Sequence, residues 1–295
     1  MLKTRMLTAS VLLPLCICLI LFSSYNLFAY ITAGVIILAA YEWFKLLHIK
    51  SNIVLVGFLT IFISILTCLI FNYNFEFKNN YLFLIFIINI LFWLLNVLLI
   101  IKYSINNIAF HNFCINHSIL WKIFSLCSCL VVLIPSWLAI NYIKHNNNYY
   151  LLGIIFMVIS IDCGGYFGGK FLGKHKLSIV SPNKTWEGVW VGYVISILVM
   201  LMFFMGIMSD NKPFYAYSIM KILKHIGYII IFTQIFLVLS VIGDLFESLL
   251  KRISTVKDSG NILPGHGGIL DRLDSVLAVM PIAALGYYIY VGYIF

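Results

Sequence analysis

One short stretch of the sequence places two acids, a hydroxyl and a base on one side of a predicted helix. Residues spaced i, i+3, i+4 and i+7 line up along one face of an α-helix. At that spacing the stretch holds Asp244, Glu247, Ser248 and Lys251. Mg²⁺ selects carboxylate oxygens, usually one or two of them together with the phosphate oxygens of a substrate. The pattern therefore predicts a site that handles a metal ion and phosphate.

A second pair of acids, Asp271 and Asp274, begins the last apolar run of the chain and repeats the i, i+3 spacing. Between the two pairs lies the segment Pro264–Gly268, whose glycine N–H groups can approach phosphate oxygens closely. The alternative is an ordinary loop at the membrane surface with aspartates that cap a helix. Ordinary loops rarely combine paired acids, a pair of bases such as Lys251-Arg252 and a His-Gly-Gly turn in one short segment. The combination therefore favours the phosphate site.

Another candidate acid, Asp162, lies inside an apolar run. An unpaired charge there would cost about 3 kcal/mol on membrane-insertion scales, so we expect a metal ion or a cation beside it. The glycines that follow predict close packing against another helix, because small residues four apart let two backbones approach. These glycines are Gly164, Gly165, Gly168 and Gly169.

Basic residues after this run, namely Lys174, His175, Lys176 and Lys184, are candidate triphosphate ligands. Their alternative is the plain positive charge that cytoplasmic loops of membrane proteins carry.

Glu42 is the acid of the N-terminal half with a candidate role, near the cytoplasmic end of the second apolar run. A carboxylate in a membrane helix is costly and often functional. The equal alternative is that Glu42 extends to the membrane interface beside Trp43.

The elements that must position these residues are membrane spans. The chain of 295 residues is 63% hydrophobic and 10% charged, whereas soluble proteins carry about 25% charged residues. Apolar runs of about 20 residues, long enough to cross a bilayer, recur along the whole length. We therefore predict an all-α polytopic membrane protein of about nine transmembrane helices, with a polar active site at the cytoplasmic side of the C-terminal helices. The predicted spans are 7–22, 27–46, 52–71, 81–101, 119–143, 149–169, 186–208, 226–247 and 273–294.

Two regions follow from this pattern. Residues 1–145 form an N-terminal membrane region of about five spans. Residues 146–295 form a catalytic region of about four spans, with cytoplasmic loops 170–185 and 248–272. The seven cysteines are odd in number and without metal-ligand spacing, so neither a disulfide framework nor a zinc site is indicated.

The basic residues are distributed unevenly between the two sides of the membrane. With the N-terminus in the cytoplasm, 14 of the 19 fall on the cytoplasmic side, which is the distribution of an inner-membrane protein. The net charge of +9 therefore does not indicate a nucleic-acid partner. The five on the opposite side are Lys78, Lys144, Lys212, Lys221 and Lys224.

The segment from Ser248 to Asp274 resembles the signature of the phosphatidate cytidylyltransferase (CDP-diacylglycerol synthase) family. The shared features are the serine, a Lys-Arg pair, a Lys-Asp pair, Pro-x-His-Gly-Gly and Asp-Arg-x-Asp, all at the family's spacing. Segments 173–177 and 181–188 are also similar to that family. Residues 177–180 depart from it, because the family usually carries a slightly longer segment with a basic residue there.

The resemblance implies a nucleotidyltransferase of phospholipid biosynthesis in a bacterial inner membrane. The reaction would join CTP and phosphatidic acid to give CDP-diacylglycerol and pyrophosphate, with Mg²⁺ as cofactor and room for a second cation. Membrane lipid is a further expected partner. The sequence leaves open whether the protein forms a homodimer.

Roles can then be assigned to individual residues. We predict catalytic roles for Asp244, Asp271, Lys251, Arg252 and His266. Expected metal ligands are Asp244 and Asp271, supported by Glu247, Asp274 and Asp162. Expected substrate-binding residues are Ser181, Lys184, Thr185, Ser248, Lys257 and Arg272.

Three other functions were weighed against this one. A transporter or channel would also carry intramembrane acids, but its polar residues would not gather on one side of the membrane. A CDP-alcohol phosphatidyltransferase would need a D-G-x-x-A-R motif, which this sequence lacks. A CTP-dependent polyprenol kinase stays open on physical grounds.

Overall fold

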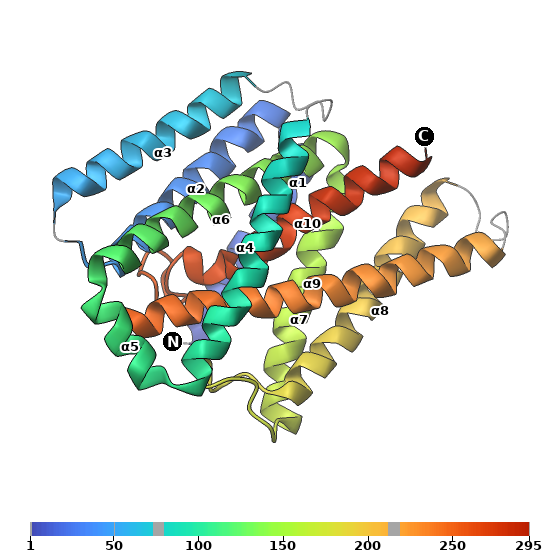
Figure 1. The fold of residues 1–295 in the computed structure, drawn as a ribbon. Coiled ribbons are helices and arrows are strands. Elements are labelled where there is room, and N and C mark those ends of the chain that lie inside the picture. The colour runs from blue at the N-terminus through green and yellow to red at the C-terminus, as the bar shows by residue number, and fades with distance from the viewer. Residues whose placement is uncertain (1, 50, 73–79, 212–218, 295) are drawn as a thin grey trace.

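The computed structural model describes residues 2–49, 51–72, 80–211 and 219–294. The basic residues Lys50, Lys78 and Lys212 lie outside these ranges. Within them the chain forms ten helices and no strand (Figure 1). The helices are α1 (Leu2–Phe22), α2 (Tyr25–Leu46), α3 (Asn52–Asn72), α4 (Asn80–Ile105), α5 (Asn107–Asn116), α6 (Ser118–Asn146), α7 (Asn148–Leu172), α8 (Trp186–Asn211), α9 (Ile219–Ile253) and α10 (Leu270–Ile294).

Eight of the described helices are long and apolar enough to cross a membrane, namely α2, α3, α4, α6, α7, α8, α9 and α10. The prediction of an all-α polytopic membrane protein is confirmed. The first predicted span lies in α1, whose described apolar segment Ser10–Phe22 is shorter than a span. The short helix α5 was not predicted.

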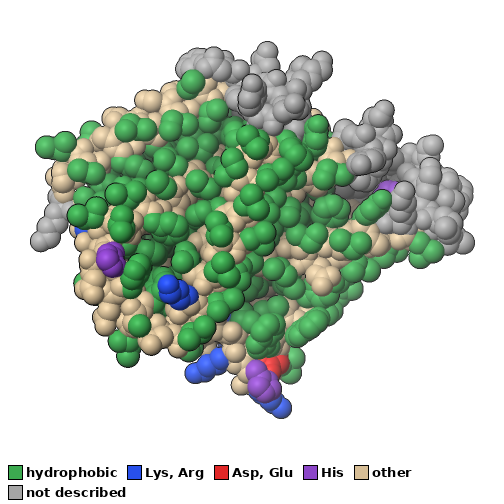
Figure 2. Space-filling view, viewed as in Figure 1, with side chains coloured by type: hydrophobic (Ala, Val, Ile, Leu, Met, Phe, Trp, Pro, Cys, Tyr) green, Lys and Arg blue, Asp and Glu red, His purple; other side chains and the backbone are tan. Residues whose placement is uncertain are grey.

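The spans divide into a central and a peripheral set. In α6 and α10, 56% of the apolar span is buried inside the protein, against 11% in α3 and 17% in α8. Figure 1 shows α3 and α8 at opposite edges of the bundle. Apolar side chains also cover most of the face in Figure 2, and most charged side chains of that view lie along its left and lower edges. An apolar surface of this extent is expected where a protein meets lipid rather than water.

Aromatic side chains pack behind the part of α9 that carries the predicted acids. Phe246 is buried, and its ring meets Trp93 edge to face at 5.7 Å between centroids. Phe92 and Trp43 contact the same ring at 5.9 and 6.0 Å. This packing fixes the rotation of α9, so the opposite face presents its polar residues to α10.

Helices α7 and α8 pack closely through their glycines, as the sequence predicts. A Cβ on Gly164 would lie 2.7 Å from the Cα of Gly192, and one on Gly168 would lie 2.5 Å from the Cβ of Val191. Neither position has room for a side chain. The close contact fixes the short connection between the two helices, residues 173–185.

Gly192→Ala is expected to destabilise this helix pair, since the new Cβ would lie 2.7 Å from the carbonyl oxygen of Ile161. Overpacking of this kind costs about 1–3 kcal/mol. Thermal unfolding in detergent measures the effect, with Gly57→Ala as the matched control because no atom lies within 4 Å of a Cβ there. Equal melting temperatures for the two variants would contradict the packing account.

Candidate active site

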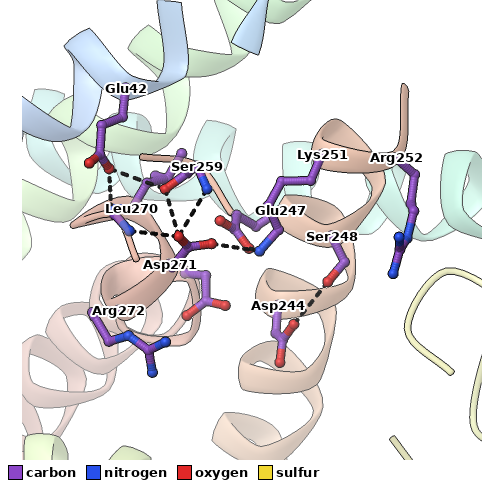
Figure 3. Close-up of polar contacts among 12 residues, drawn as sticks. Glu42, Asp244, Glu247, Ser248, Lys251, Arg252, Ser259, Leu270, Asp271 and Arg272 are labelled. Atoms are coloured by element: carbon purple, nitrogen blue, oxygen red, sulfur yellow. Dashed lines mark hydrogen bonds and ion pairs between the residues drawn. The ribbon is translucent and has the colours of Figure 1, made fainter. Parts of the chain in front are cut away.

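At the junction of α9 and α10, a half-buried lysine bridges two carboxylates. The Nζ of Lys251 lies 2.5 Å from Oε2 of Glu247 and 2.6 Å from Oδ1 of Asp271 (Figure 3). The exposed fractions of the three side chains are 15%, 5% and 6%. We call these residues the Lys251 group. A buried ion pair with additional hydrogen bonds holds its geometry firmly, because separating the charges would leave them unpaired away from water.

Asp271 also organises the connection between α9 and α10, residues 254–269. Its Oδ2 accepts hydrogen bonds from the backbone N–H of Ser259 at 2.9 Å, the hydroxyl of Ser259 at 3.0 Å and the backbone N–H of Gly268 at 2.8 Å. With Lys251 on the other oxygen, this carboxylate receives four donors. In the described structure Asp271 is therefore an anchor for the loop as well as a partner of Lys251.

The turn Pro264–Gly268 forms as the sequence predicts. Gly265 and Gly267 have φ angles of 77° and 85°, which glycine adopts without steric cost. The N–H of Leu263 donates to the carbonyl of Gly267, and the N–H of His266 donates to that of Leu263. A Cβ on Gly267 would lie 2.8 Å from Oδ2 of Asp271, so the turn lies directly against that carboxylate.

A second lysine comes from the connection between α7 and α8. The Nζ of Lys184 lies 2.5 Å from Oδ2 of Asp244 on α9. Its position is set by a tight turn, in which the N–H of Lys184 donates to the carbonyl of Ser181 and the N–H of Leu177 donates to the carbonyl of Lys184. Burial lowers the pKa of the Lys184 ammonium, but attraction to Asp244 outweighs this and the pKa lies above its usual value. Lys184 therefore carries its charge at neutral pH.

Two further acids lie near this pair. The hydroxyl of Ser275 donates to Oδ1 of Asp162 at 3.3 Å, and the N–H of Ser275 donates to Oδ1 of Asp274 at 2.8 Å. Both acids interact electrostatically with Lys184. Lys184 therefore acts on Asp162 through its charge, while the direct partner of this carboxylate is Ser275. We call Lys184, Asp244, Asp162 and Asp274 the Lys184 group.

The donor chemistry of the two groups suits a hard divalent cation. Together they hold five carboxylates and two ammonium groups, so negative charge is in excess. Oε1 of Glu247 is buried and has no hydrogen-bond partner among the described residues. In the part of the chain that the structure describes, no three His, Cys, Asp or Glu side chains are arranged to hold one metal ion together. The lysines lie between the carboxylates instead.

Two more of the predicted residues, Ser248 and Arg252, lie beside the two groups. The hydroxyl of Ser248 donates to Asp244 at 3.2 Å. The Nε of Arg252 lies 3.4 Å from the carbonyl oxygen of Val180, and Figure 3 shows its side chain away from Asp271. Arg252 thus contacts residues 177–180, the segment that departs from the family pattern.

The remaining predicted residues contact loop residues, cap a helix or are exposed. Arg272 donates two hydrogen bonds to the carbonyl oxygen of His266, at 3.2 and 3.0 Å, and the Nδ1 of His266 contacts the hydroxyl of Thr8 in α1. Thr185 accepts a hydrogen bond from the N–H of Gly188 and so caps α8. The side chain of Lys257 is exposed.

Sequence reasoning gave no site role to Glu187 or Ser259. Glu187 accepts from the backbone N–H groups of Lys174 and His175 and lies 2.6 Å from Nδ1 of His175. It holds the start of the 173–185 connection to α8. The sequence signal that could have identified Glu187 is an acid in the first turn of a helix, directly after a basic segment. Ser259 joins two acids, as described below, and no local pattern marks it.

Comparison with known proteins extends these observations. The sequence profile of the cytidylyltransferase family matches residues 3–290. Phosphatidate cytidylyltransferases of Haemophilus influenzae and Pseudomonas aeruginosa are 32% and 29% identical to this chain, over 98% and 96% of its length and 99% and 96% of theirs. That of Bacillus subtilis is 46% identical over 133 residues, 45% of each chain. The profile match includes every residue of the Lys184 and Lys251 groups.

Proposed function

Because the chain belongs to the cytidylyltransferase family, we propose that it transfers CMP from CTP to phosphatidic acid, giving CDP-diacylglycerol and pyrophosphate. The observation that carries this proposal is that two lysine–carboxylate groups are built side by side from α7, α9, the first turns of α10 and the connection 173–185. Two polyanions must approach one another in this reaction, and fixed cations near a membrane surface suit that task. The proteins named phosphatidate cytidylyltransferase match nearly the whole chain.

The chemistry requires no covalent protein intermediate. A phosphate oxygen of the lipid attacks the α-phosphorus of CTP, a new P–O bond forms, and the bond to the β-phosphate oxygen breaks with its electrons leaving on pyrophosphate. The lipid phosphate is already ionised at neutral pH, so no general base is needed. In this proposal Lys184 binds the triphosphate, because it lies in a polar connection, and Lys251 with Arg252 serves the lipid phosphate or the departing pyrophosphate. Positioning and charge neutralisation supply the rate enhancement.

Mg²⁺ is the cofactor we propose, held by Asp244 and Asp271 with support from Glu247, Asp274 and Asp162. When bound, it would neutralise phosphate charge and stabilise the charge that develops on the leaving group. The excess of carboxylates over lysines supports this assignment.

The test is product identification with purified protein in detergent micelles that contain phosphatidic acid, CTP and Mg²⁺. Mass spectrometry should find CDP-diacylglycerol, and its amount should depend on both substrates. A protein that is folded by thermal unfolding but forms no liponucleotide would refute the proposal.

We further propose that the 173–185 and 254–269 connections face the cytoplasm of a bacterium, where CTP is found. In a cysteine-free background, Asn261→Cys should then react with a membrane-impermeant thiol reagent only after the cytoplasmic side is exposed. Asn146→Cys, at the opposite end of the bundle, is the matched control and should react from outside. The reverse pattern would overturn the proposed orientation.

A further inference from the structure

Glu42 reaches from α2 into the connection between α9 and α10. Its side chain is buried, with 1% of the residue exposed. The Oε2 atom accepts hydrogen bonds from the backbone N–H of Leu270 at 2.8 Å and from the hydroxyl of Ser259 at 3.2 Å (Figure 3). A side chain that extended to the membrane interface would be exposed, so burial excludes that alternative for Glu42.

The surrounding backbone closes tightly on this carboxylate. A Cβ on Gly260 would lie 2.3 Å from Oε1 of Glu42, and one on Gly268 would lie 2.5 Å from Oε2. Leu270 begins α10, and a negative charge at the start of a helix is favoured by its unpaired N–H groups and dipole. The loop is therefore shaped around Glu42, and Glu42 stabilises the start of α10.

Ser259 connects Glu42 to the Lys251 group. Its hydroxyl lies 3.2 Å from Glu42 and 3.0 Å from Asp271, while its backbone N–H donates to Asp271 at 2.9 Å. A hydroxyl has one hydrogen to donate, so the two acids share it. If Glu42 moved away, the side chain of Ser259 would lose one of its two carboxylate partners. Ser259 would then hold Asp271 less firmly in its position opposite Lys251.

The end of α2 also holds the first residue of the same connection. The hydroxyl of Ser254 donates to the carbonyl of Leu46 at 2.6 Å, and the Nε2 of His48 lies 2.9 Å from the carbonyl oxygen of Ser254. The C-terminal end of α2 thus anchors the connection at its beginning, at Ser259 and at the start of α10.

From these contacts we infer that Glu42 is a positioning residue for cytidylyl transfer, acting through Ser259 and the N-terminus of α10 to set Asp271 against Lys251. The inference rests on the proposed function. Glu42 touches no reacting atom in it, so its loss should change the rate of the chemical step and leave CTP binding at Lys184 largely intact.

Glu42→Ala is expected to lower kcat about 10²-fold, the effect of a displacement of about 1 Å in a catalytic group, with the KM for CTP changed less than about threefold. Glu42→Gln should lose less than about tenfold, because its amide oxygen can still accept from Leu270 and Ser259. The matched control is Ser125→Ala, which leaves the buried N–H of neighbouring Trp43 without its partner at 3.0 Å and touches no part of the loop. It should keep kcat. If Glu42→Ala does not accumulate, Glu42→Asp, which keeps the charge but is shorter, replaces it.

Hydrogen exchange of the 254–272 segment separates a failure of this inference from a failure of the proposed function. Glu42→Ala should speed exchange in that segment and leave α4 and α6 unchanged, whether or not the protein forms CDP-diacylglycerol. A double variant with Ser259→Ala should lose less rate than the two single losses combined, since Glu42 and Ser259 belong to one contact chain. Unchanged exchange, a rise in the KM for CTP without a fall in kcat, or additive losses would each overturn the role of Glu42.

Discussion

Asp244→Asn is expected to lower kcat/KM for CTP by about 10³-fold, the upper range for removing one electrostatic contributor from an active site. The carboxylate of Asp244 holds Lys184 at 2.5 Å and accepts from Ser248 at 3.2 Å. Asparagine has the same size but no charge, so Lys184 would lose its ion pair. Under the proposed metal assignment a ligand would be lost as well. The helices pack through their other faces, and the fold should persist.

Steady-state kinetics in mixed micelles at a fixed surface concentration of phosphatidic acid measures this loss, with thermal unfolding as the check on folding. Glu187→Gln is the matched comparison, because it also removes one negative charge near the same connection. Its amide oxygen can still accept from the N–H groups of Lys174 and His175, so we expect less than about a tenfold loss. Equal losses for the two variants would show that net charge, and not the Asp244–Lys184 contact, sets the rate.

Lys251→Ala is expected to remove both activity and stability. Without its ammonium, the buried carboxylates of Glu247 and Asp271 would face one another unpaired. Breaking a buried ion pair by removing one partner costs about 3–5 kcal/mol. The sequence alone predicts only a catalytic role for Lys251, because residue spacing does not reveal that both partner carboxylates are buried.

Thermal unfolding of detergent-solubilised protein should therefore show a clear fall in melting temperature for Lys251→Ala. Lys251→Arg, which keeps the positive charge, should unfold near the wild-type temperature while its rate falls, since a guanidinium does not reproduce the position of a single ammonium. A wild-type melting temperature for Lys251→Ala would contradict the buried bridge.

The spans could be predicted from the sequence because each needs only a local apolar run. Their ends could not. The apolar span 226–247 marks only part of α9, which runs from Ile219 to Ile253; the spacing of the polar residues predicts the helix as far as Lys251, but not its end. The loop 248–272 is accordingly shorter in the structure, residues 254–269. Helix α5 was missed because it is only ten residues long and too short for a hydropathy signal.

Local spacing predicted which side chains share a helix face, but not what each one contacts. Asp271 and Asp274 stand at i, i+3, yet Asp271 holds the loop and Lys251 while Asp274 lies near Asp162 and Asp244. The Lys184–Asp244 pair joins residues on separate elements, and no periodicity specifies such a pair.

Glu42 illustrates the same limit in another way. The sequence left its role open, because a carboxylate near a span end can face either the interface or the protein. Its partners, Ser259 and Leu270, lie more than two hundred residues away in the chain. Only the packing of α2 against the 254–269 connection shows that Glu42 faces the protein and not the interface.

CTP labelled with ³²P at either the α- or the γ-position, given to the purified protein with phosphatidic acid and Mg²⁺, tests the proposed reaction most directly. A cytidylyl transfer moves the α-phosphorus into the lipid fraction and releases the γ-phosphorus as pyrophosphate. We predict α-label in the lipid and γ-label in pyrophosphate, both lost in Asp244→Asn. Transfer of γ-label to a lipid would instead identify a kinase and contradict the account, as would α-label transfer that Asp244→Asn leaves unchanged.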